Sequence, residues 1–210
     1  MSKDATKAFE KISFVDMRPA CVKQTEKQIE TEITASLKYL SMAAHFSKDT
    51  VNRPGFAKLF FEAASEEREH AYKLIEYLSM RGSLNTTGEI PRIDISRLVK
   101  ESGSLTVSNV QLTNLKLSND DKTTTSGLIA LQNALKLEVF VTESIRKLVK
   151  ICEDEQFNHY HFVDYLTGEF LDEQYKGQRD LAGKISTLSK MVNTQGGSEL
   201  ADFLFDKQLL

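Results

Sequence analysis

The chain has 210 residues, of which 40% are apolar and 27% charged, and these proportions are ordinary for a soluble globular protein with one well-filled core. The formal net charge is −3, and no run of lysine and arginine is dense enough to indicate nucleic acid or a membrane surface as the main partner. No apolar stretch approaches the roughly 20 residues that cross a bilayer, and the first residues lack the apolar core of a signal peptide. We therefore expect either a cytosolic protein or a mature secreted protein to which Met1 has been added.

The composition favours helix over sheet, so we expect an all-α protein. The chain has only three prolines and ten glycines, and it is rich in leucine, lysine, glutamate and alanine. After an N-terminal extension of residues 1–19, a first helix is predicted from about Ala20 to Phe46. A second helix is predicted from Pro54, which suits the first turn of a helix, to Gly82, which can adopt the left-handed conformation beyond a helix end.

The pattern changes over residues 83–125, which are rich in serine, threonine and asparagine and have no sustained hydrophobic period. We interpret this segment as one long surface connection. A third helix is predicted over residues 126–152, a fourth over 159–191 and a short fifth over 198–210. Helices joined by a short, a long and a short link are typical of a four-helix bundle with one crossover, and the whole chain is expected to be one domain.

The two cysteines, Cys21 and Cys152, lie at the start of the first predicted helix and at the end of the third. Short links place neighbouring helices antiparallel, whereas the long connection leaves the second and third helices parallel. The first and third helices then run in opposite directions, so both cysteines are expected at the same end of the bundle. One disulfide and two free thiols are both compatible with this placement.

Polar residues interrupt the apolar faces of three predicted helices. At about 100° per residue, Glu67 falls in the centre of the apolar stripe of the second helix, and His70 falls near its edge. Glu138 points inward from the third helix, while Glu32 and Tyr39 lie on one line of the first helix, two turns apart. Because the three glutamates lie at a similar depth near the middle of their helices, we expect them to meet.

Three carboxylates and one imidazole inside a bundle carry a net negative charge that requires a cation. Oxygen ligands with one histidine suit iron or manganese, which di-metal carboxylate bundles hold with glutamates and Glu-x-x-His pairs. Glu67 and His70 form such a pair, and Glu67 is placed to bridge two metals. A single inward Glu or His is more often a hydrogen-bonded core residue, and Tyr39 is compatible with an ordinary core tyrosine. The agreement of three helices favours the metal site.

The fourth helix lacks a second Glu-x-x-His pair. Its candidate segment "LDEQYKGQ" has Glu173 and Gln174, with Gly177 in place of a histidine. A second metal would be held by Glu138, Glu67 and little else, and Gln174 could only hydrogen-bond a water or dioxygen. A poorly ligated position loses its ion easily, so the site is expected to oxidise iron and pass it on.

These residues resemble those of the ferritins, specifically the heavy-type chains with ferroxidase activity. The resemblance covers nearly the whole chain except residues 83–125, and it rests on "EITASLKYLSM", "FAKLFFEAASEEREHAYKL", "ALKLE", "FLDEQYK" and "LADFLFDK". The segments "HFSKDTVNRPGF" and "DEQYKGQRDLAGK" are most similar to the secreted insect-type heavy chain. The resemblance implies a ferritin-like four-helix bundle with one long crossover and a short fifth C-terminal helix.

The resemblance also implies roles for particular residues. It assigns the first iron site to Glu32, Glu67 and His70, and the second to Glu66, Glu67 and Glu138. It assigns Tyr39 and Gln174 to catalysis around the irons. It places mineral nucleation on Glu62, Glu66 and Glu69, although Tyr72 stands where heavy chains often have a third carboxylate. At the threefold entry channel Asp164 matches the family, whereas Thr167 replaces a second acidic residue.

For the whole molecule, the resemblance implies a hollow shell of 24 subunits, with identical chains or with a ferritin light-type chain as partner. Such chains oxidise Fe(II) with dioxygen or peroxide, store the ferric mineral inside and use no organic cofactor. Insect-type heavy chains are usually proteins of the secretory pathway with disulfides, which favours a Cys21–Cys152 bridge and a secreted protein over a cytoplasmic one. Two alternatives are a non-storage di-iron carboxylate oxidase and a structural shell subunit without oxidase activity.

Overall fold

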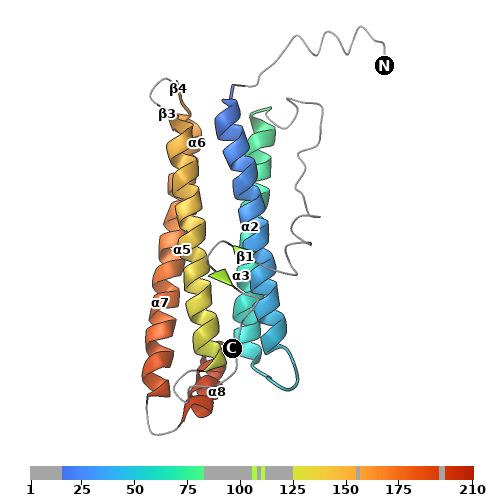
Figure 1. Cartoon of the computed structure of the whole chain (residues 1–210), viewed down its shortest axis with the longest axis vertical. Coiled ribbons are helices and arrows are strands. Elements are labelled where there is room, and N and C mark those ends of the chain that lie inside the picture. Colours follow the sequence, from blue (N-terminus) through green and yellow to red (C-terminus); the bar gives the residue numbers. More distant parts are fainter. Residues whose placement is uncertain (1–15, 83–105, 108–109, 112–124, 155–156, 194–196) are drawn as a thin grey trace, which may run out of the picture.

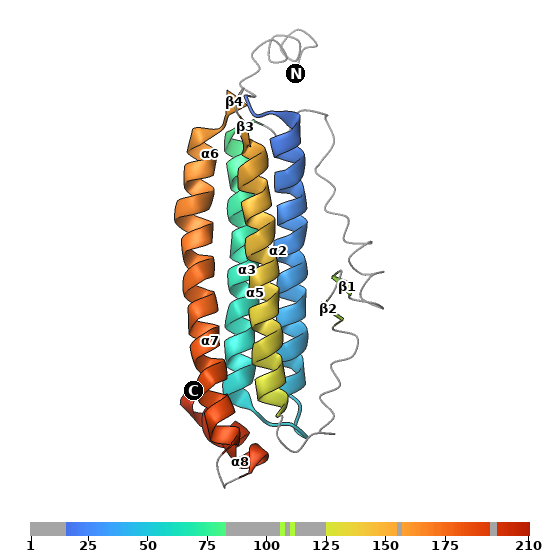
Figure 2. The same ribbon diagram turned by 60° about the vertical axis from the view of Figure 1, so that its left-hand side comes forward.

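The computed structural model describes residues 16–82, 106–107, 110–111, 125–154, 157–193 and 197–210, which form an elongated helical bundle (Figures 1 and 2). Three of its long helices are α2 (Pro19–Phe46), α3 (Pro54–Met80) and α5 (Ser126–Cys152). The fourth is built from α6 (Tyr160–Tyr165), the π-helix η4 (Leu166–Leu171) and α7 (Asp172–Val192), and it is followed by the short α8 (Ser198–Gln208). The predicted four-helix bundle with a short fifth helix is confirmed. Among the described helices, none is both long and apolar enough to cross a membrane.

Residues with special backbone properties mark the helix ends. Pro19 and Pro54 occupy the first turns of α2 and α3, where the missing N–H costs no hydrogen bond. Beyond α3, Gly82 adopts the left-handed conformation with a φ of 66°, as its position predicts. The hydroxyl of Thr125 accepts a hydrogen bond of 3.1 Å from the Leu128 N–H and so caps the start of α5.

The helices run in the predicted directions. Both α3 and α5 pack against α2, and α7 packs against α5. In Figures 1 and 2, α3 and α5 run parallel to one another, while α2 runs opposite to both. Most of the 83–125 connection and of the 1–19 extension lies outside the described residues.

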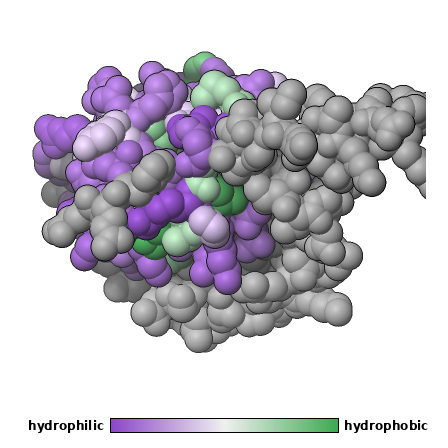
Figure 3. Space-filling view, turned by 90° about the horizontal axis from the view of Figure 1, so that it is seen from above, coloured by the Kyte–Doolittle hydropathy of each residue, from purple (hydrophilic) through white to green (hydrophobic). Residues whose placement is uncertain are grey.

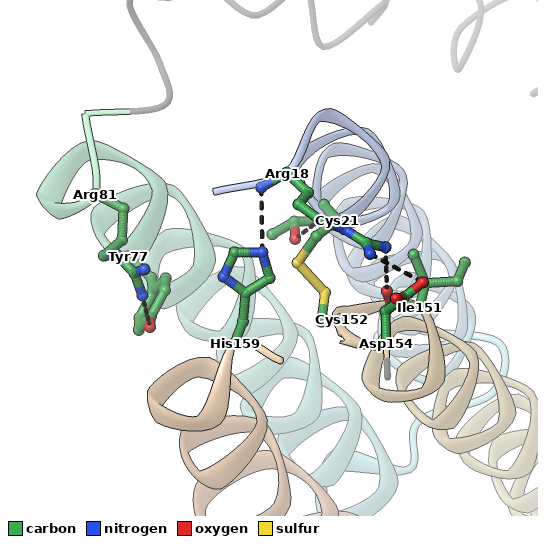
Figure 4. Close-up of a disulfide and its surroundings, with 9 residues drawn as sticks. Arg18, Cys21, Tyr77, Arg81, Ile151, Cys152, Asp154 and His159 are labelled. Atoms are coloured by element: carbon green, nitrogen blue, oxygen red, sulfur yellow. Dashed lines mark hydrogen bonds and ion pairs between the residues drawn. A yellow bond between two sulfur atoms is a disulfide. The ribbon is translucent and has the colours of Figure 1, made fainter. Parts of the chain in front are cut away.

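A disulfide closes the end of the bundle where α2 begins. Cys21 and Cys152 are joined, so the predicted bridge is confirmed (Figure 4). Beside it, the Arg18 guanidinium pairs with the Asp154 carboxylate at 2.9 Å, and the Arg18 N–H donates to His159 Nε2 at 3.1 Å. Figure 3 looks down on this end, where hydrophilic side chains surround a few hydrophobic ones. The start of α2 is therefore held to the end of α5 and to the start of α6.

Aromatic stacks fill both halves of the core. Near α8, the rings of Phe56 and Phe60 lie 5.0 and 5.7 Å from that of Phe46. Toward the disulfide end, Tyr77 stacks on Phe162 at 4.3 Å. The middle of the bundle, between these stacks, is where the inward glutamates lie.

The structure differs from the sequence prediction in two places. The fourth helix is not one uninterrupted α-helix, because η4 interrupts it with wider π turns. Its buried residues Phe162, Leu166, Phe170 and Gln174 recur every four residues, a spacing that the wider turn keeps on one face. The structure also contains two antiparallel ladders, of β1 (Thr106–Val107) with β2 (Val110–Gln111) and of β3 (Glu153–Asp154) with β4 (Phe157–Asn158). Strands of two residues are too short to show the alternation of apolar and polar residues from which a strand is predicted.

Candidate metal centre

Three buried side chains converge at the middle of the bundle. Glu32 projects from α2, and Glu67 and His70 project from adjacent turns of α3. Their exposed fractions are 0%, 3% and 5%. Each offers one ligand atom, and these atoms lie within 4.8 Å of one another. In the described part of the chain, this is the only group of three or more His, Cys, Asp or Glu residues with metal-binding spacing.

The polar atoms of this group that lack a hydrogen-bond partner suit a metal ion. Glu32 Oε2, Glu67 Oε2 and His70 Nδ1 are buried, and none has a hydrogen-bond partner among the described residues. A buried polar atom without a partner costs roughly 1 to 3 kcal/mol, so three such atoms at one place indicate a site for an ion. Carboxylate oxygens with one imidazole nitrogen are a donor set for iron or manganese, and the residues therefore fit such an ion.

Burial shifts the carboxyl groups toward their neutral forms. The pKa of Glu32 is raised well above its usual range by burial and further by the charge of Glu67. Burial likewise raises the pKa of Glu67, and the neighbouring Glu138 carboxylate adds to the increase. Burial also raises the pKa of Glu138, although a hydrogen bond from Tyr39 opposes the shift. A bound cation would remove this penalty, because it favours the ionised carboxylates that ligate it.

Hydrogen bonds fix the carboxylates that face the centre. Gln28 Nε2 donates to Glu32 Oε1 at 2.8 Å, and Gln28 Oε1 accepts from Ser144 Oγ of α5 at 2.5 Å. The Tyr39 hydroxyl donates to Glu138 Oε1, so α2 orients a carboxylate of α5 as well as its own. Both glutamates are thus held in place through contacts between α2 and α5.

The first turns of α7 complete the centre. Gln174 is buried, and its Oε1 accepts from Thr142 Oγ1 at 2.8 Å. Gln178 Nε2 donates to Thr142 Oγ1 at 2.6 Å, which continues the network along α7. Glu173 Oε2 lies 3.2 Å from His70 Nε2 and so connects α7 to α3.

Five of these supporting residues were not predicted to act at the site: Gln28, Thr142, Ser144, Glu173 and Gln178. Gln28 could have been found, because it precedes Glu32 by one helical turn and lies on the same face. The contacts of Thr142, Glu173 and Gln178 depend on how α7 is rotated against its neighbours. A sequence pattern that identifies the buried face of one helix does not specify that rotation.

A cavity of about 180 Å³ connects the centre to the surface. Its buried part is lined by Tyr39, Glu67, His70, Glu138 and Gln174. Its outer part includes Glu62 and Glu66, which are exposed on α3. Carboxylates therefore line the cavity from the buried centre to the exposed face of α3.

The other predicted residues do not join the group of three. Glu138 faces Tyr39, and Glu66 lines the cavity from an exposed position, so a second iron position made by both remains a prediction. Glu69 is exposed on α3. Asp164 and Thr167 are exposed one turn apart where α6 meets η4, and the Thr167 hydroxyl donates to its own helix at Val163 O (2.9 Å). Their channel would form between subunits, so it also remains a prediction.

A four-helix bundle with buried carboxylates and an inward Glu-x-x-His pair defines the class of carboxylate-bundle metalloproteins. Comparison with known proteins narrows this class. The ferritin-like domain matches residues 22–191. The ferritin heavy chains of Drosophila melanogaster and Papilio xuthus are each 52% identical to this chain, over 93% and 94% of its length and over 84% and 82% of theirs. The chain belongs to the ferritin family.

A solved structure supports the same conclusion. The crystal structure of Trichoplusia ni secreted ferritin matches this chain with a TM-score of 0.73 at 51% identity, and the match covers 93% of this chain and 91% of that one. The resemblance to heavy-type ferritins, and to those of insects in particular, is thereby confirmed.

Proposed function

We propose that this chain is a heavy-type ferritin subunit that oxidises Fe(II) at the centre formed by Glu32, Glu67 and His70. One observation carries the proposal. Each of these residues has a buried polar atom without a hydrogen-bond partner among the described residues, and one ligand atom from each lies within 4.8 Å of the other two. The names of the insect relatives, ferritin heavy chains, support iron as the metal and a ferroxidase as the activity. Iron is then the substrate of the site.

Each residue of the centre has its own role in this proposal. Glu32, Glu67 and His70 bind the first Fe(II), while Glu67 also faces Glu138, which binds the second together with Glu66. Gln28 and Tyr39 hold the carboxylates in place through the hydrogen bonds described above. Gln174 lines the cavity, where its amide can bind water or dioxygen. Two Fe(II) together give two electrons, which with two protons reduce dioxygen to hydrogen peroxide or hydrogen peroxide to two waters. The ferric ions then leave by the carboxylate-lined cavity.

At the level of the assembly, we infer a 24-subunit shell that stores the ferric mineral, with or without a light-type partner chain. Glu62, Glu66 and Glu69 are exposed on one helix, which suits the nucleation of mineral on a shared face. Asp164 and Thr167 are proposed to line the entry channel. The secreted relative and the Cys21–Cys152 disulfide support a protein of the secretory pathway, where disulfides form readily.

The double substitution Glu67→Lys with His70→Gly tests the proposal. It removes two of the three ligands and places a cation in the centre, so rapid Fe(II) oxidation should fall more than about 100-fold. The rate is followed by the absorbance of the ferric product, and light scattering checks that the assembly keeps its size. Unchanged oxidation kinetics would rule out this site.

A matched control is Glu76→Lys, which makes the same charge change on an exposed position of α3 that does not line the cavity. It should oxidise Fe(II) at the native rate. A native protein that forms only a small oligomer would instead favour a non-storage di-iron oxidase. A native protein that assembles into a full shell but does not oxidise Fe(II) would favour a purely structural subunit.

A further inference from the structure

The His70 ring lies between two carboxylates from different helices. Its Nδ1 lies 3.5 Å from Glu67 Oε2 on the side of the metal centre. Its Nε2 lies 3.2 Å from Glu173 Oε2 on the opposite side of the ring. The Glu173 side chain is 50% exposed while that of His70 is 6% exposed, so Glu173 reaches the ring from the surface of the bundle.

The chemistry of the two groups determines which nitrogen carries the hydrogen. An ionised carboxylate accepts hydrogen bonds and cannot donate them, so the contact with Glu173 requires a hydrogen on His70 Nε2. In the neutral imidazole, Nδ1 then presents its lone pair. This is the nitrogen that faces Glu67 and that has no hydrogen-bond partner among the described residues. Glu173 thus favours the tautomer that can bind a metal through Nδ1.

The fold holds the ring from the same short segment. Phe170, the fifth residue of η4, packs its ring 5.4 Å from the His70 ring at an interplanar angle of 47°. Three residues later, in the first turn of α7, Glu173 meets Nε2. The π turn directly before α7 sets the rotation at which Glu173 and Gln174 follow Phe170. The segment from Phe170 to Glu173 therefore restricts both the position and the rotation of the His70 ring, through packing and a hydrogen bond.

We propose that Glu173 is a positioning residue that orients His70 for metal binding through its Nε2–H hydrogen bond. This inference rests on the proposed iron centre. Histidines that ligate metals commonly donate their other ring N–H to a carboxylate, and loss of such a partner typically lowers metal affinity about 10- to 100-fold. Glu173 is the carboxylate that occupies this position here, and it acts on the metal through His70.

Cobalt(II) binding tests the role without any oxidation step. Co(II) alone is titrated into the native assembled protein and its variants, and the affinity and the visible absorption band of the centre are recorded. The Co(II) absorption that native protein shows and the Glu67→Lys, His70→Gly variant lacks is assigned to the centre. Glu173→Ala should weaken this binding about 10- to 100-fold and shift the band. Glu173→Gln keeps an oxygen that can accept from Nε2–H and should stay within about threefold of the native affinity.

The control is Asp172→Asn, which removes the same charge one residue earlier. Asp172 is exposed and pairs with Lys176 at 2.5 Å, away from His70, so Co(II) binding should not change. Thermal unfolding of each variant checks that the bundle is intact.

The possible results separate this inference from the proposed function. If native protein shows no Co(II) signal beyond that of the double variant, the iron centre itself is wrong. If the native signal is present but Glu173→Ala binds as tightly, the positioning role is wrong and the centre stands. A Glu173→Gln variant that loses as much affinity as Glu173→Ala would show that the charge of Glu173 matters rather than its hydrogen bond, which also overturns the proposal.

Discussion

Lys38 of α2 lies one residue before Tyr39 and is not part of the group of three at the candidate metal centre. Its side chain is completely buried, and its Nζ has no hydrogen-bond partner in the part of the chain that the structure describes. Burial lowers the pKa of Lys38 to about 8. An amine in this position is costly when charged, since it exchanges water for an apolar environment.

Lys38→Met should therefore stabilise the protein at neutral pH. In the unfolded chain Lys38 titrates near 10.5, so between pH 8 and 10.5 the unfolded state binds a proton that the folded state has released. Stability of the native protein rises with pH across this window, and the charged form costs stability below pH 8. We expect Lys38→Met to gain roughly 1 to 3 kcal/mol at pH 7, and this gain should shrink toward pH 10.5.

Thermal unfolding measured from pH 7 to pH 10.5 checks this expectation. Lys27→Met, an exposed position on the same helix, is the control and should leave the unfolding temperature almost unchanged. If Lys38→Met brings no gain at pH 7, the charged amine does not destabilise the folded protein and the expectation is wrong.

At the scale of elements, α8 is attached to the bundle through the starts of two other helices. Asp206 Oδ1 accepts a 3.0 Å hydrogen bond from the Phe56 N–H in the first turn of α3. Asp202 Oδ2 accepts a 3.1 Å hydrogen bond from the Gly127 N–H in the first turn of α5. Both carboxylates lie at the positive ends of helix dipoles, where negative charge is stabilising. The short last helix thus caps two long ones.

The close approach of α8 requires glycine at Gly55. A Cβ on this residue would lie 2.0 Å from the backbone oxygen of Asp206, and a backbone oxygen cannot move unless α8 moves with it. Gly55→Ala should displace α8, with a loss of about 1 to 3 kcal/mol and faster proteolytic cleavage within residues 198–210. The control is Gly183→Ala in α7, where a Cβ meets no other part of the described chain within 4 Å apart from its own helix turn. It should be neutral or stabilising by up to about 1 kcal/mol. Equal protease resistance of α8 in both variants would contradict the packing requirement.

Local patterns were sufficient to predict the long helices and the inward face of each. Pro54 and Gly82 bound the second helix because their backbone restrictions act within one turn. Glu67 and His70 could be placed inside because helical spacing alone puts them on the apolar stripe of α3. Features that depend on contacts between helices could not be predicted in this way. The π turn of η4, the contact of Glu173 with His70 and the two aspartate caps of α8 are set by the relative rotation and register of packed helices.

At the scale of the whole molecule, the disulfide and the candidate metal centre lie at different positions along the bundle. The Cys21–Cys152 disulfide connects residues 131 positions apart in sequence and closes one end. Glu32 lies 11 residues after Cys21 on the same helix, which corresponds to about 16 Å along its axis. Arg18, Asp154 and His159 keep non-covalent contacts at the disulfide end. The bridge should therefore contribute to stability with little effect on the geometry of the centre.

The variant with both Cys21→Ser and Cys152→Ser tests this separation. Loss of a disulfide typically costs about 2 to 4 kcal/mol, and in a chain of this size each kcal/mol lowers the unfolding temperature by about 2 to 4 °C, so a decrease of roughly 4 to 16 °C is expected. The Fe(II) oxidation rate at 25 °C should stay within about twofold of native, because the ligands lie in the middle of helices whose packing is retained. Native protein unfolded in the presence of a thiol reductant should approach the unfolding temperature of the variant. A variant that keeps its unfolding temperature but loses Fe(II) oxidation would show the reverse, that the bridge positions the centre rather than stabilising the bundle.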